Sequence, residues 1–277
     1  MRKPLSVLVP CGNSADVVED CLRSVAWADE IVVVDSFSTD GAAEIAKRYA
    51  SRILRHEYVD SATQKNWAIP QVSHDWVLIV DTDERVSGEL RNEIYNLLKD
   101  PGEVVGYKIP RLNHAWGRPL RHGGNYPDYQ LRLFHKDKGR YDNRRVHAHV
   151  VLDGPVGVIR NPLLHFGQRS VHQVTQHLLG DFTTWEAEER HRQGKRFSVP
   201  QTIGRSVAAF VYRYFWLRGF QDLIPGFFMA GFWAAYVFLT YAKLWELERR
   251  EAVPHQAAGR PDCSLSLVQP DNRGEPT

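Results

Sequence analysis

Apolar runs that stop abruptly at polar residues dominate the first third of the chain. Three of them, over residues 5–9, 31–34 and 77–80, are short and rich in β-branched side chains. Such runs are typical of strands that are buried on both faces of a sheet. Between the runs, apolar residues recur at spacings near 3.6, which predicts helices. Strands that alternate with helices indicate an α/β fold with a mostly parallel sheet, whose ligands bind where its strands end.

The connecting segments agree with this alternation. Asp40 is expected to be the N-cap of a helix that runs to about Tyr49. Residues 52–54 are expected to form a short strand, and residues 64–69 a helix. The helical pattern after the first strand has one apolar face, which consists of Val17, Val18, Cys21, Leu22 and Val25.

Two carboxylates follow the strand over residues 77–80. Asp81 and Asp83 are two positions apart on an extended segment, so their side chains point the same way. Such a pair suits a hard divalent cation that neutralises a leaving diphosphate. A surface turn is the simpler interpretation of the pair alone, since Asp is common in turns. Asp35, which ends the strand over residues 31–34, favours the cation site because both strand ends are expected at the same edge of the sheet.

The middle of the chain has a different pattern. Residues 107–111 and 130–134 alternate like strands. The loop between them is polar and rich in glycine, and it ends in Asp128. A polar loop with a carboxylate at a strand start is where an acceptor site could be built. The alternative is that Asp128 only begins a turn after Pro127.

Composition changes towards the C-terminus. Residues 169–202 are charged and helical in pattern and are expected to form a connector. Residues 203–250 are rich in aromatic residues, and residues 223–242 lack charges over a length that could cross a bilayer. We expect two helices, over 203–218 and 226–249, that dock on or dip into the cytoplasmic leaflet of a membrane, because prolines and glycines interrupt the run and basic residues flank it. A single membrane span and a buried helical hairpin are the alternatives.

Bulk properties narrow the classes further. The 35 basic and 33 acidic residues give a net charge of +2, which offers no case for a nucleic-acid partner. Three widely spaced cysteines indicate a reducing compartment. The apolar run after Lys3 is too short for a signal peptide, so the chain is expected to begin with the first strand of a cytosolic domain. Residues 251–277 are rich in proline and are expected to be disordered.

Four segments in this order resemble the nucleotide-binding half of glycosyltransferase family 2, the inverting enzymes with a GT-A fold: SVLVPCGN, EIVVVDSFSTDG, QKNWAI and VLIVDTDERV. Two later segments, GGNYPDYQLRLFHKDKGRY and VHAHV, are similar to the subgroup that contains the lipopolysaccharide-core glucosyltransferases of the WaaE/KdtX type. The resemblance covers about residues 4–250. It implies a GT-A domain, Rossmann-like, over residues 1–168, with a donor half over about 1–100 and an acceptor half over about 101–168.

The resemblance also implies roles for individual residues. Asp128 would be the catalytic base that takes the proton of the acceptor hydroxyl. Asp83, Asp81 and His147 would be metal ligands for Mg²⁺ or Mn²⁺. A nucleotide diphosphate sugar, expected to be a UDP-sugar, would contact Pro10, Asn13, Asp35, Lys65 and Asp81.

Simpler interpretations stand beside several of these roles. Lys65 could be a solvated helix lysine, and His147 with His149 could be ordinary histidines of a strand. Arg132 could hold Asp128, hold a phosphate or pair at the surface. For His165, His172 and His177, the lack of tight ligand spacing favours ordinary histidines over a separate metal centre.

The sequence therefore predicts an inverting transferase at the cytoplasmic face of the inner membrane. It would move a hexose, with glucose expected, from the nucleotide sugar to a lipopolysaccharide core or another lipid-linked glycan. One alternative is a non-catalytic, membrane-bound nucleotide-sugar binding protein. Another is a sugar nucleotidyltransferase, although the opening of the chain lacks a glycine-rich, lysine-bearing phosphate loop.

Overall fold

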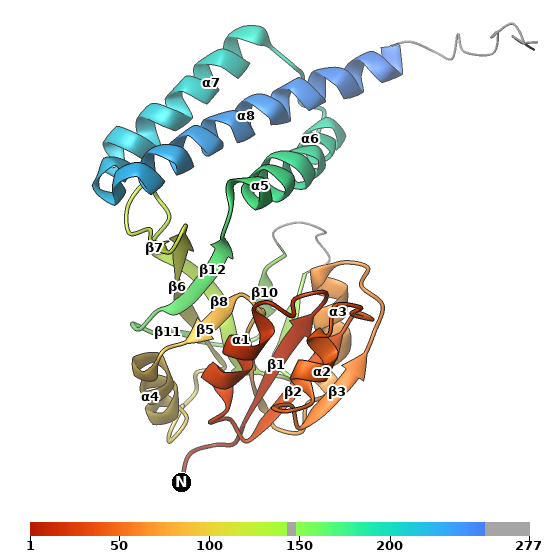
Figure 1. Ribbon diagram of the computed structural model, residues 1–277, viewed down its shortest axis with the longest axis vertical. Coiled ribbons are helices and arrows are strands. Elements are labelled where there is room, and N and C mark those ends of the chain that lie inside the picture. The colour runs from red at the N-terminus through yellow and green to blue at the C-terminus, as the bar shows by residue number, and fades with distance from the viewer. Residues whose placement is uncertain (143–147, 253–277) are drawn as a thin grey trace, which may run out of the picture.

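The computed structural model describes residues 1–142 and 148–252. A sheet with helices on its faces forms the lower part of Figure 1, and a group of helices forms the upper part. The described strands all lie between Leu5 and Gln168, and the regular elements after them are helical.

The strands are β1 (Leu5–Cys11), β2 (Glu30–Asp35), β3 (Arg52–Arg55), β4 (Trp76–Ile79), β5 (Glu84–Val86), β6 (Gly106–Ala115), β7 (Arg118–Pro119), β8 (Asp128–His135), β9 (Gly139–Tyr141), β10 (Val150–Leu152), β11 (Val156–Val158) and β12 (Leu163–Gln168). The helices of the sheet region are α1 (Val18–Val25), α2 (Ala42–Ala46), α3 (Ser61–Ala68), the 3₁₀ turn η1 (Ile69–Gln71) and α4 (Gly88–Leu97). The later ones are α5 (Val171–Val174), the π-helix η2 (Thr175–Asp181), α6 (Phe182–Arg192), α7 (Val199–Val211), the π-helix η3 (Tyr212–Trp216), the 3₁₀ turn η4 (Gly219–Asp222) and α8 (Leu223–Ala252).

One large sheet has the strand order β3-β2-β1-β4-β8-β6-β12-β5, with β7 and β11 paired to β6. Strands β3, β2, β1 and β4 are parallel. Strand β8 is antiparallel to both β4 and β6, and β12 is parallel to β6. The carboxyl ends of β1, β2, β4, β6 and β12 and the amino end of β8 therefore meet at one edge, which we call the carboxyl edge. The predicted α/β class with a mostly parallel central region is confirmed.

The central strands are buried on both faces, as their apolar runs predict. Leu5, Val7 and Val9 of β1 pack with the side of the sheet that α1, α2 and α4 cover. Leu8 points the other way and packs with the layer that includes α3. The apolar face predicted for the first helix is also present, because Val18, Cys21, Leu22 and Val25 of α1 are buried.

The start of α2 differs from the prediction. The N-cap residue is Gly41, with φ of 90°, and not Asp40. Glycine enters this left-handed conformation without the steric cost that a side chain brings. The Asp40 carboxylate still accepts the Ala42 N–H (3.0 Å), and it also accepts the Ala15 N–H (2.8 Å) from the loop after β1.

The predicted pair of C-terminal helices is present with wider limits. Helix α7 begins at Val199, and α8 extends over 30 residues from Leu223 to Ala252. Helix α8 packs against α7 and also against α6 (Figure 1). The prediction of disorder for residues 251–277 falls, beyond Ala252, outside the described residues.

Candidate functional site

The loops after β1 and β2 are joined at the carboxyl edge. Asn13 adopts a left-handed conformation, with φ of 44°, and its Oδ1 accepts the Thr39 N–H at 2.9 Å. Asp35 is buried, and its Oδ1 accepts the Ser38 N–H at 3.1 Å. Pro10 and Asp35 lie at the neighbouring ends of the paired strands β1 and β2, and Asn13 follows β1. Their role in holding a nucleoside stays a prediction.

Asp81 is held between two buried cations. Its Oδ1 lies 2.9 Å from Lys65 Nζ, and its Oδ2 accepts a 2.6 Å hydrogen bond from Arg132 Nη2. Burial alone would raise the pKa of Asp81, but Arg132 and Lys65 outweigh it and hold that pKa well below its usual range. Lys65 is therefore no solvated helix lysine, since its side chain is only 6% exposed. A contact of Lys65 with the donor phosphate stays a prediction.

Glu84 extends the same ionic network. Its side chain is fully buried, its Oε1 accepts from Arg132 Nη2 at 2.9 Å, and its Oε2 accepts the Asp81 N–H at 2.9 Å. Arg111 Nη1 lies 3.7 Å from the same Oε1. Arg132 thus binds two carboxylates beneath the carboxyl edge, and it neither holds Asp128 nor pairs at the surface.

Asp128 sits at the amino end of β8, opposite Arg111 of β6. Its Oδ2 accepts from Arg111 Nε (2.9 Å) and Nη2 (2.6 Å), and its Oδ1 accepts from Gln130 Nε2 (2.7 Å). Burial would raise the pKa of Asp128, but Arg111 and these hydrogen bonds lower it below its usual value. The carboxylate is therefore charged at neutral pH and partly exposed, which a proton acceptor needs.

His165 of β12 faces Asp83. The His165 Nε2 atom lies 3.3 Å from Asp83 Oδ2, and its Nδ1 lies 2.6 Å from Asn113 Oδ1. Because the amide oxygen can only accept, Nδ1 carries a proton, and in the neutral ring Nε2 then presents a lone pair. When Nε2 also carries a proton, the ring is charged and donates to Asp83, and in that state it outweighs the effect of burial and lowers the pKa of Asp83. A bound cation would take the place of that second proton.

Gly167 keeps the space in front of this pair open. A Cβ atom at Gly167 would lie 2.6 Å from His165 Nε2 and 3.2 Å from Asp83 Oδ2. A carboxylate oxygen and an imidazole nitrogen that converge on an open space suit Mg²⁺ or, better, Mn²⁺. The residues present thus fit a divalent cation. Among the described residues, Asp83 and His165 would be best placed to hold it, while both oxygens of Asp81 are engaged by Lys65 and Arg132. The roles of Asp83 and Asp81 as metal ligands stay predictions.

The structure describes only one residue of the predicted histidine pair. His147 lies outside the described residues, so its role as a ligand stays a prediction. His149 is not in a strand but precedes β10, where it is exposed and its N–H donates to Asp142 Oδ1 at 3.2 Å. Sequence reasoning assigned His165 to ordinary histidines, and the structure places it beside Asp83 instead.

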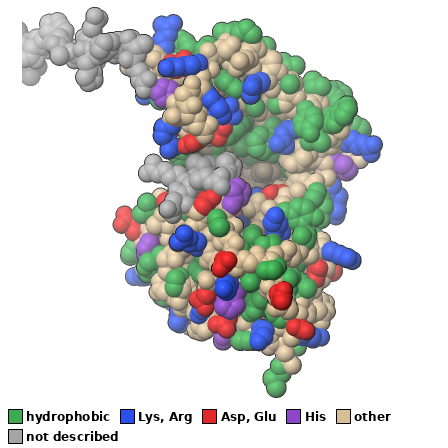
Figure 2. Space-filling view, turned by 180° about the vertical axis from the view of Figure 1, so that it is seen from behind, with side chains coloured by type: hydrophobic (Ala, Val, Ile, Leu, Met, Phe, Trp, Pro, Cys, Tyr) green, Lys and Arg blue, Asp and Glu red, His purple; other side chains and the backbone are tan. Residues whose placement is uncertain are grey.

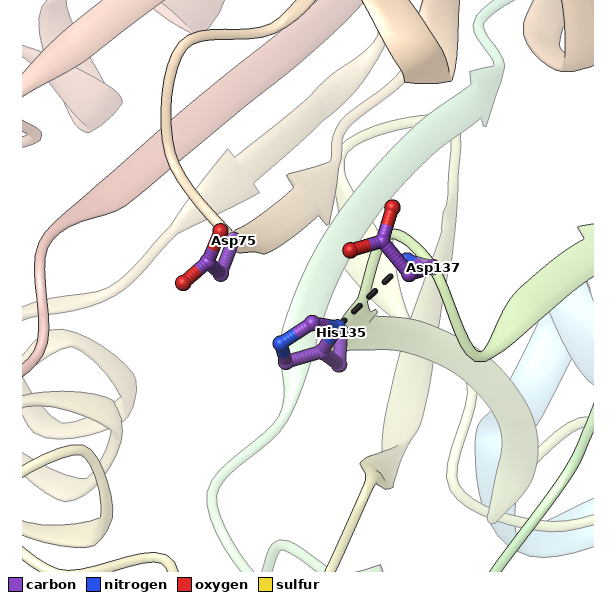
Figure 3. A group of neighbouring side chains, drawn as sticks. All are labelled: Asp75, His135 and Asp137. Carbon is purple, nitrogen blue, oxygen red and sulfur yellow. Dashed lines mark hydrogen bonds between the residues drawn. The ribbon is translucent and has the colours of Figure 1, made fainter.

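A second group of possible ligands lies elsewhere. Within the two described stretches, Asp75, His135 and Asp137 bring one ligand atom each within 4.8 Å of one another (Figure 3). Asp75 precedes β4 and His135 ends β8, so the group lies at the edge opposite the carboxyl edge. The six residue steps from Asp75 to Asp81 correspond to about 20 Å of extended chain. A metal at this group could not contact a diphosphate at Asp83.

Comparison with known proteins identifies the family of this chain. The sequence profile described as "Glycosyl transferase family 2" matches residues 6–163. The lipopolysaccharide core biosynthesis glycosyltransferase LpsC of Rhizobium meliloti (strain 1021) is 32% identical over 262 residues, which cover 92% of this chain and 96% of that protein. An uncharacterized glycosyltransferase of Rickettsia typhi is 26% identical over 88% of each chain.

Solved structures show more distant similarity. The crystal structure of S. aureus TarS residues 1–349 in complex with UDP-GlcNAc is 15% identical, covers 90% of this chain and 92% of its own, and has a TM-score of 0.47. Glucosyl-3-phosphoglycerate synthase from Mycobacterium tuberculosis, in complex with Mn²⁺, UDP and glucosyl-3-phosphoglycerate, is 20% identical over 40% of this chain and 44% of its own, with a TM-score of 0.35. The profile match over more than half of the chain, together with the 32% identity to LpsC, establishes that this chain belongs to glycosyl transferase family 2 and has its GT-A fold.

Proposed function

We propose that this chain transfers a hexose from a nucleotide diphosphate sugar to a lipopolysaccharide core or another lipid-linked glycan, with inversion at the anomeric carbon. One observation carries the proposal. The Asp83–His165 pair and Asp128 lie at the same edge of the sheet as Asp35 and the loop after β1. A donor bound across this edge would have its diphosphate at Asp83 and its sugar towards Asp128.

The residues divide the chemistry between them. Pro10, Asn13 and Asp35 would hold the nucleoside, and Asp83 with His165 would hold the cation. A divalent cation in this position neutralises charge on the diphosphate as it leaves. Lys65 and Arg132 keep Asp81 ionised and fixed, so the segment that carries Asp83 is already in place before the donor binds.

Asp128 would act on the acceptor. The acceptor oxygen forms a bond to the anomeric carbon while the bond from that carbon to the diphosphate oxygen breaks. The hydroxyl proton passes to Asp128, and the nucleoside diphosphate leaves with the electron pair. Arg111 holds the Asp128 carboxylate in one orientation through two hydrogen bonds to Oδ2.

The lipid-linked acceptor is inferred from two features. First, the relative LpsC, which aligns over nearly its whole length, is described as a lipopolysaccharide core biosynthesis glycosyltransferase. Second, the C-terminal region includes a helix, Gly219–Arg250, that is apolar and long enough to cross a membrane by length and composition. We therefore place the protein at the cytoplasmic face of the inner membrane.

A donor and acceptor panel tests the proposal. Nucleotide sugars with different bases and hexoses would be offered with lipopolysaccharides truncated at successive core positions, and the anomeric configuration of the product would be read by NMR. We expect one donor–acceptor combination to give nucleoside diphosphate and an inverted glycoside, and Asp128→Asn to slow product formation by roughly two to four decades. A retained configuration would contradict the mechanism. Release of a nucleoside triphosphate or pyrophosphate exchange would indicate a nucleotidyltransferase instead.

A further inference from the structure

The helical region carries an exposed apolar surface on its outer side. Ile203, Val207, Val211 and Phe215 follow one another at four-residue spacing along α7 and η3, and each is 48–59% exposed. Trp216 (77% exposed) and Ile224 (67% exposed) continue the surface over the connection to α8. We call the exposed apolar side chains between Val199 and Phe228 the docking face. Monomeric proteins rarely expose so continuous an apolar surface unless it binds something.

The position of the docking face is set by how the helices pack. Helix α8 contacts α7 on one side and α6 on another, so α7 is the element farthest from the sheet (Figure 1). In Figure 2, apolar side chains gather over the end of the helical region that is away from the C-terminal tail, with basic side chains among them. The surface is therefore open to a partner that approaches from outside.

The charges around the face favour an anionic partner. Residues 199–228 contain three arginines, Arg205, Arg213 and Arg218, and one acidic residue, Asp222. Arg205 lies over the Tyr241 ring of α8, and Arg213 lies over Trp233 and donates to Gly123 O, whereas Asp222 is bound by His122. Arg218 is exposed beside Trp216. Exposed apolar and indole side chains with an exposed arginine beside them match the surface of a lipid leaflet with anionic head groups.

The polar contacts of α8 argue against a membrane-spanning position for this helix. Lys243 Nζ donates to Gly180 O, Thr183 Oγ1 and Thr184 Oγ1, each at 2.7 Å. Glu248 Oε1 accepts the Phe197 N–H at 2.8 Å. The second half of α8 is thus fixed by polar contacts to the α6 region and its neighbours, and these would have to break if α8 crossed a bilayer alone. The face instead suits a position in the plane of the leaflet.

The segment between α7 and α8, which carries part of the docking face, also contacts the loop that leads to Asp128. Asp222 accepts both the His122 N–H and a hydrogen bond from His122 Nδ1, each at 2.8 Å. Gly123 N–H donates to Leu217 O, and Arg213 Nη1 donates to Gly123 O, both at 2.8 Å. Farther along this loop, the Asn125 carbonyl accepts from Asn113, the residue that also contacts His165. A short chain of hydrogen bonds therefore joins the docking face to the site.

We propose that the docking face lies in the surface of an anionic lipid leaflet, without crossing it, and thereby holds the loop before Asp128 next to acceptors that project from that leaflet. The proposal rests on the proposed function for its acceptor, but its test does not require turnover.

The test uses the full chain and vesicles. One set is phosphatidylcholine alone, and the other contains equal parts of phosphatidylcholine and phosphatidylglycerol. We expect the protein to sediment with the second set and much less with the first. The double variant Phe215→Ser/Ile224→Ser should bind roughly a hundredfold more weakly, because it removes two apolar side chains that would leave water. The control Val151→Ser/Val158→Ser changes two equally exposed apolar residues, each 58% exposed on β10 and β11, and should bind like the wild type.

Further measurements separate the competing outcomes. Arg218→Gln should weaken binding to the phosphatidylglycerol vesicles, and high salt should weaken it only in part. Equal sedimentation of the wild type and the double variant would overturn the proposal. So would a wild-type dimer that the double variant converts to monomers, which would show that a second copy covers the face. Resistance to alkaline extraction would show a span instead. If no nucleotide sugar is turned over but the vesicle results hold, the proposed function fails and the docking face stands.

Discussion

Glu84→Gln should destabilise the protein strongly although it leaves the number of non-hydrogen atoms in the side chain unchanged. Glu84 is fully buried and compensates Arg132, which is itself only 6% exposed. The substitution removes the negative charge and turns one acceptor into an amide donor. That donor would face either Arg132 or the Asp81 N–H, which both donate to Glu84 in the wild type.

The size of the effect follows from the geometry. Two unit charges 2.9 Å apart attract each other by about 6 kcal/mol at an effective dielectric constant of about 20. The loss of this attraction is partly offset, because burying the neutral Gln amide costs less desolvation free energy than burying a carboxylate. Breaking a buried pair by removing one partner typically costs about 3–5 kcal/mol. For a protein of this size that corresponds to a fall in Tm of roughly 6–20 °C.

Urea and thermal unfolding followed by circular dichroism measure this change. The matched control is Glu44→Gln, because Glu44 pairs with Lys47 at 3.6 Å on the surface, where both side chains are about two-thirds exposed. Its effect should be small, since exposed pairs contribute little. If Glu84→Gln unfolds at the same urea concentration and temperature as Glu44→Gln, the buried network does not stabilise the carboxyl edge in the way argued above.

Three further predictions concern the site. Asp128→Asn should lower turnover by roughly two to four decades while nucleotide binding measured by calorimetry stays unchanged, and a reversed pattern would make Asp128 a binding residue. Arg111→Gln removes the group that lowers the pKa of Asp128, so that pKa should rise; because a base works only when it is deprotonated, the acid limb of the kcat/KM profile should move to higher pH, and an unmoved limb would refute this role. Gly167→Ala should weaken Mn²⁺ binding measured by EPR in the presence of nucleoside diphosphate, because the added Cβ would lie 2.6 Å from His165 Nε2, while Gly88→Ala, which meets no atom within 4 Å, should bind Mn²⁺ normally.

The local pattern of the sequence was enough to predict the parallel strands of the sheet and the residues at which they end. Short, β-branched apolar runs such as the one before Asp81 are typical of strands that are buried on both faces, and Asp35 and Asp81 mark where two of them end. These residues could be placed at one edge because all parallel strands of a sheet end on the same side. No knowledge of strand order was needed for that inference.

Residues whose partners depend on strand order could not be found in this way. His165 reaches Asp83 because β12 pairs antiparallel to β5, which places His165 opposite Glu84 in the register. Arg132 reaches Asp81 because β8 runs antiparallel to β4. Sequence spacing contains neither fact, so His165 resembled an ordinary histidine and Arg132 resembled a partner of Asp128.

The sequence also did not predict which charged side chains are buried. Glu84 follows Asp83 in a polar stretch and has the composition of a surface turn, yet its side chain is fully buried because Arg132 and the Asp81 N–H satisfy it. A charged residue is rarely buried without such partners, and the partners come from distant segments. Only the assembled sheet shows them.

Turnover with and without metal, in the wild type and in Asp83→Ala, tests the central claim most directly. Release of nucleoside diphosphate from a nucleotide hexose would be followed in the presence of a truncated lipopolysaccharide, first with Mn²⁺ and then with EDTA. We expect wild-type turnover to stop with EDTA and return with excess Mn²⁺, and Asp83→Ala to stay folded but inactive in both conditions. Turnover that survives both EDTA and Asp83→Ala would contradict a cation-assisted transfer at the carboxyl edge.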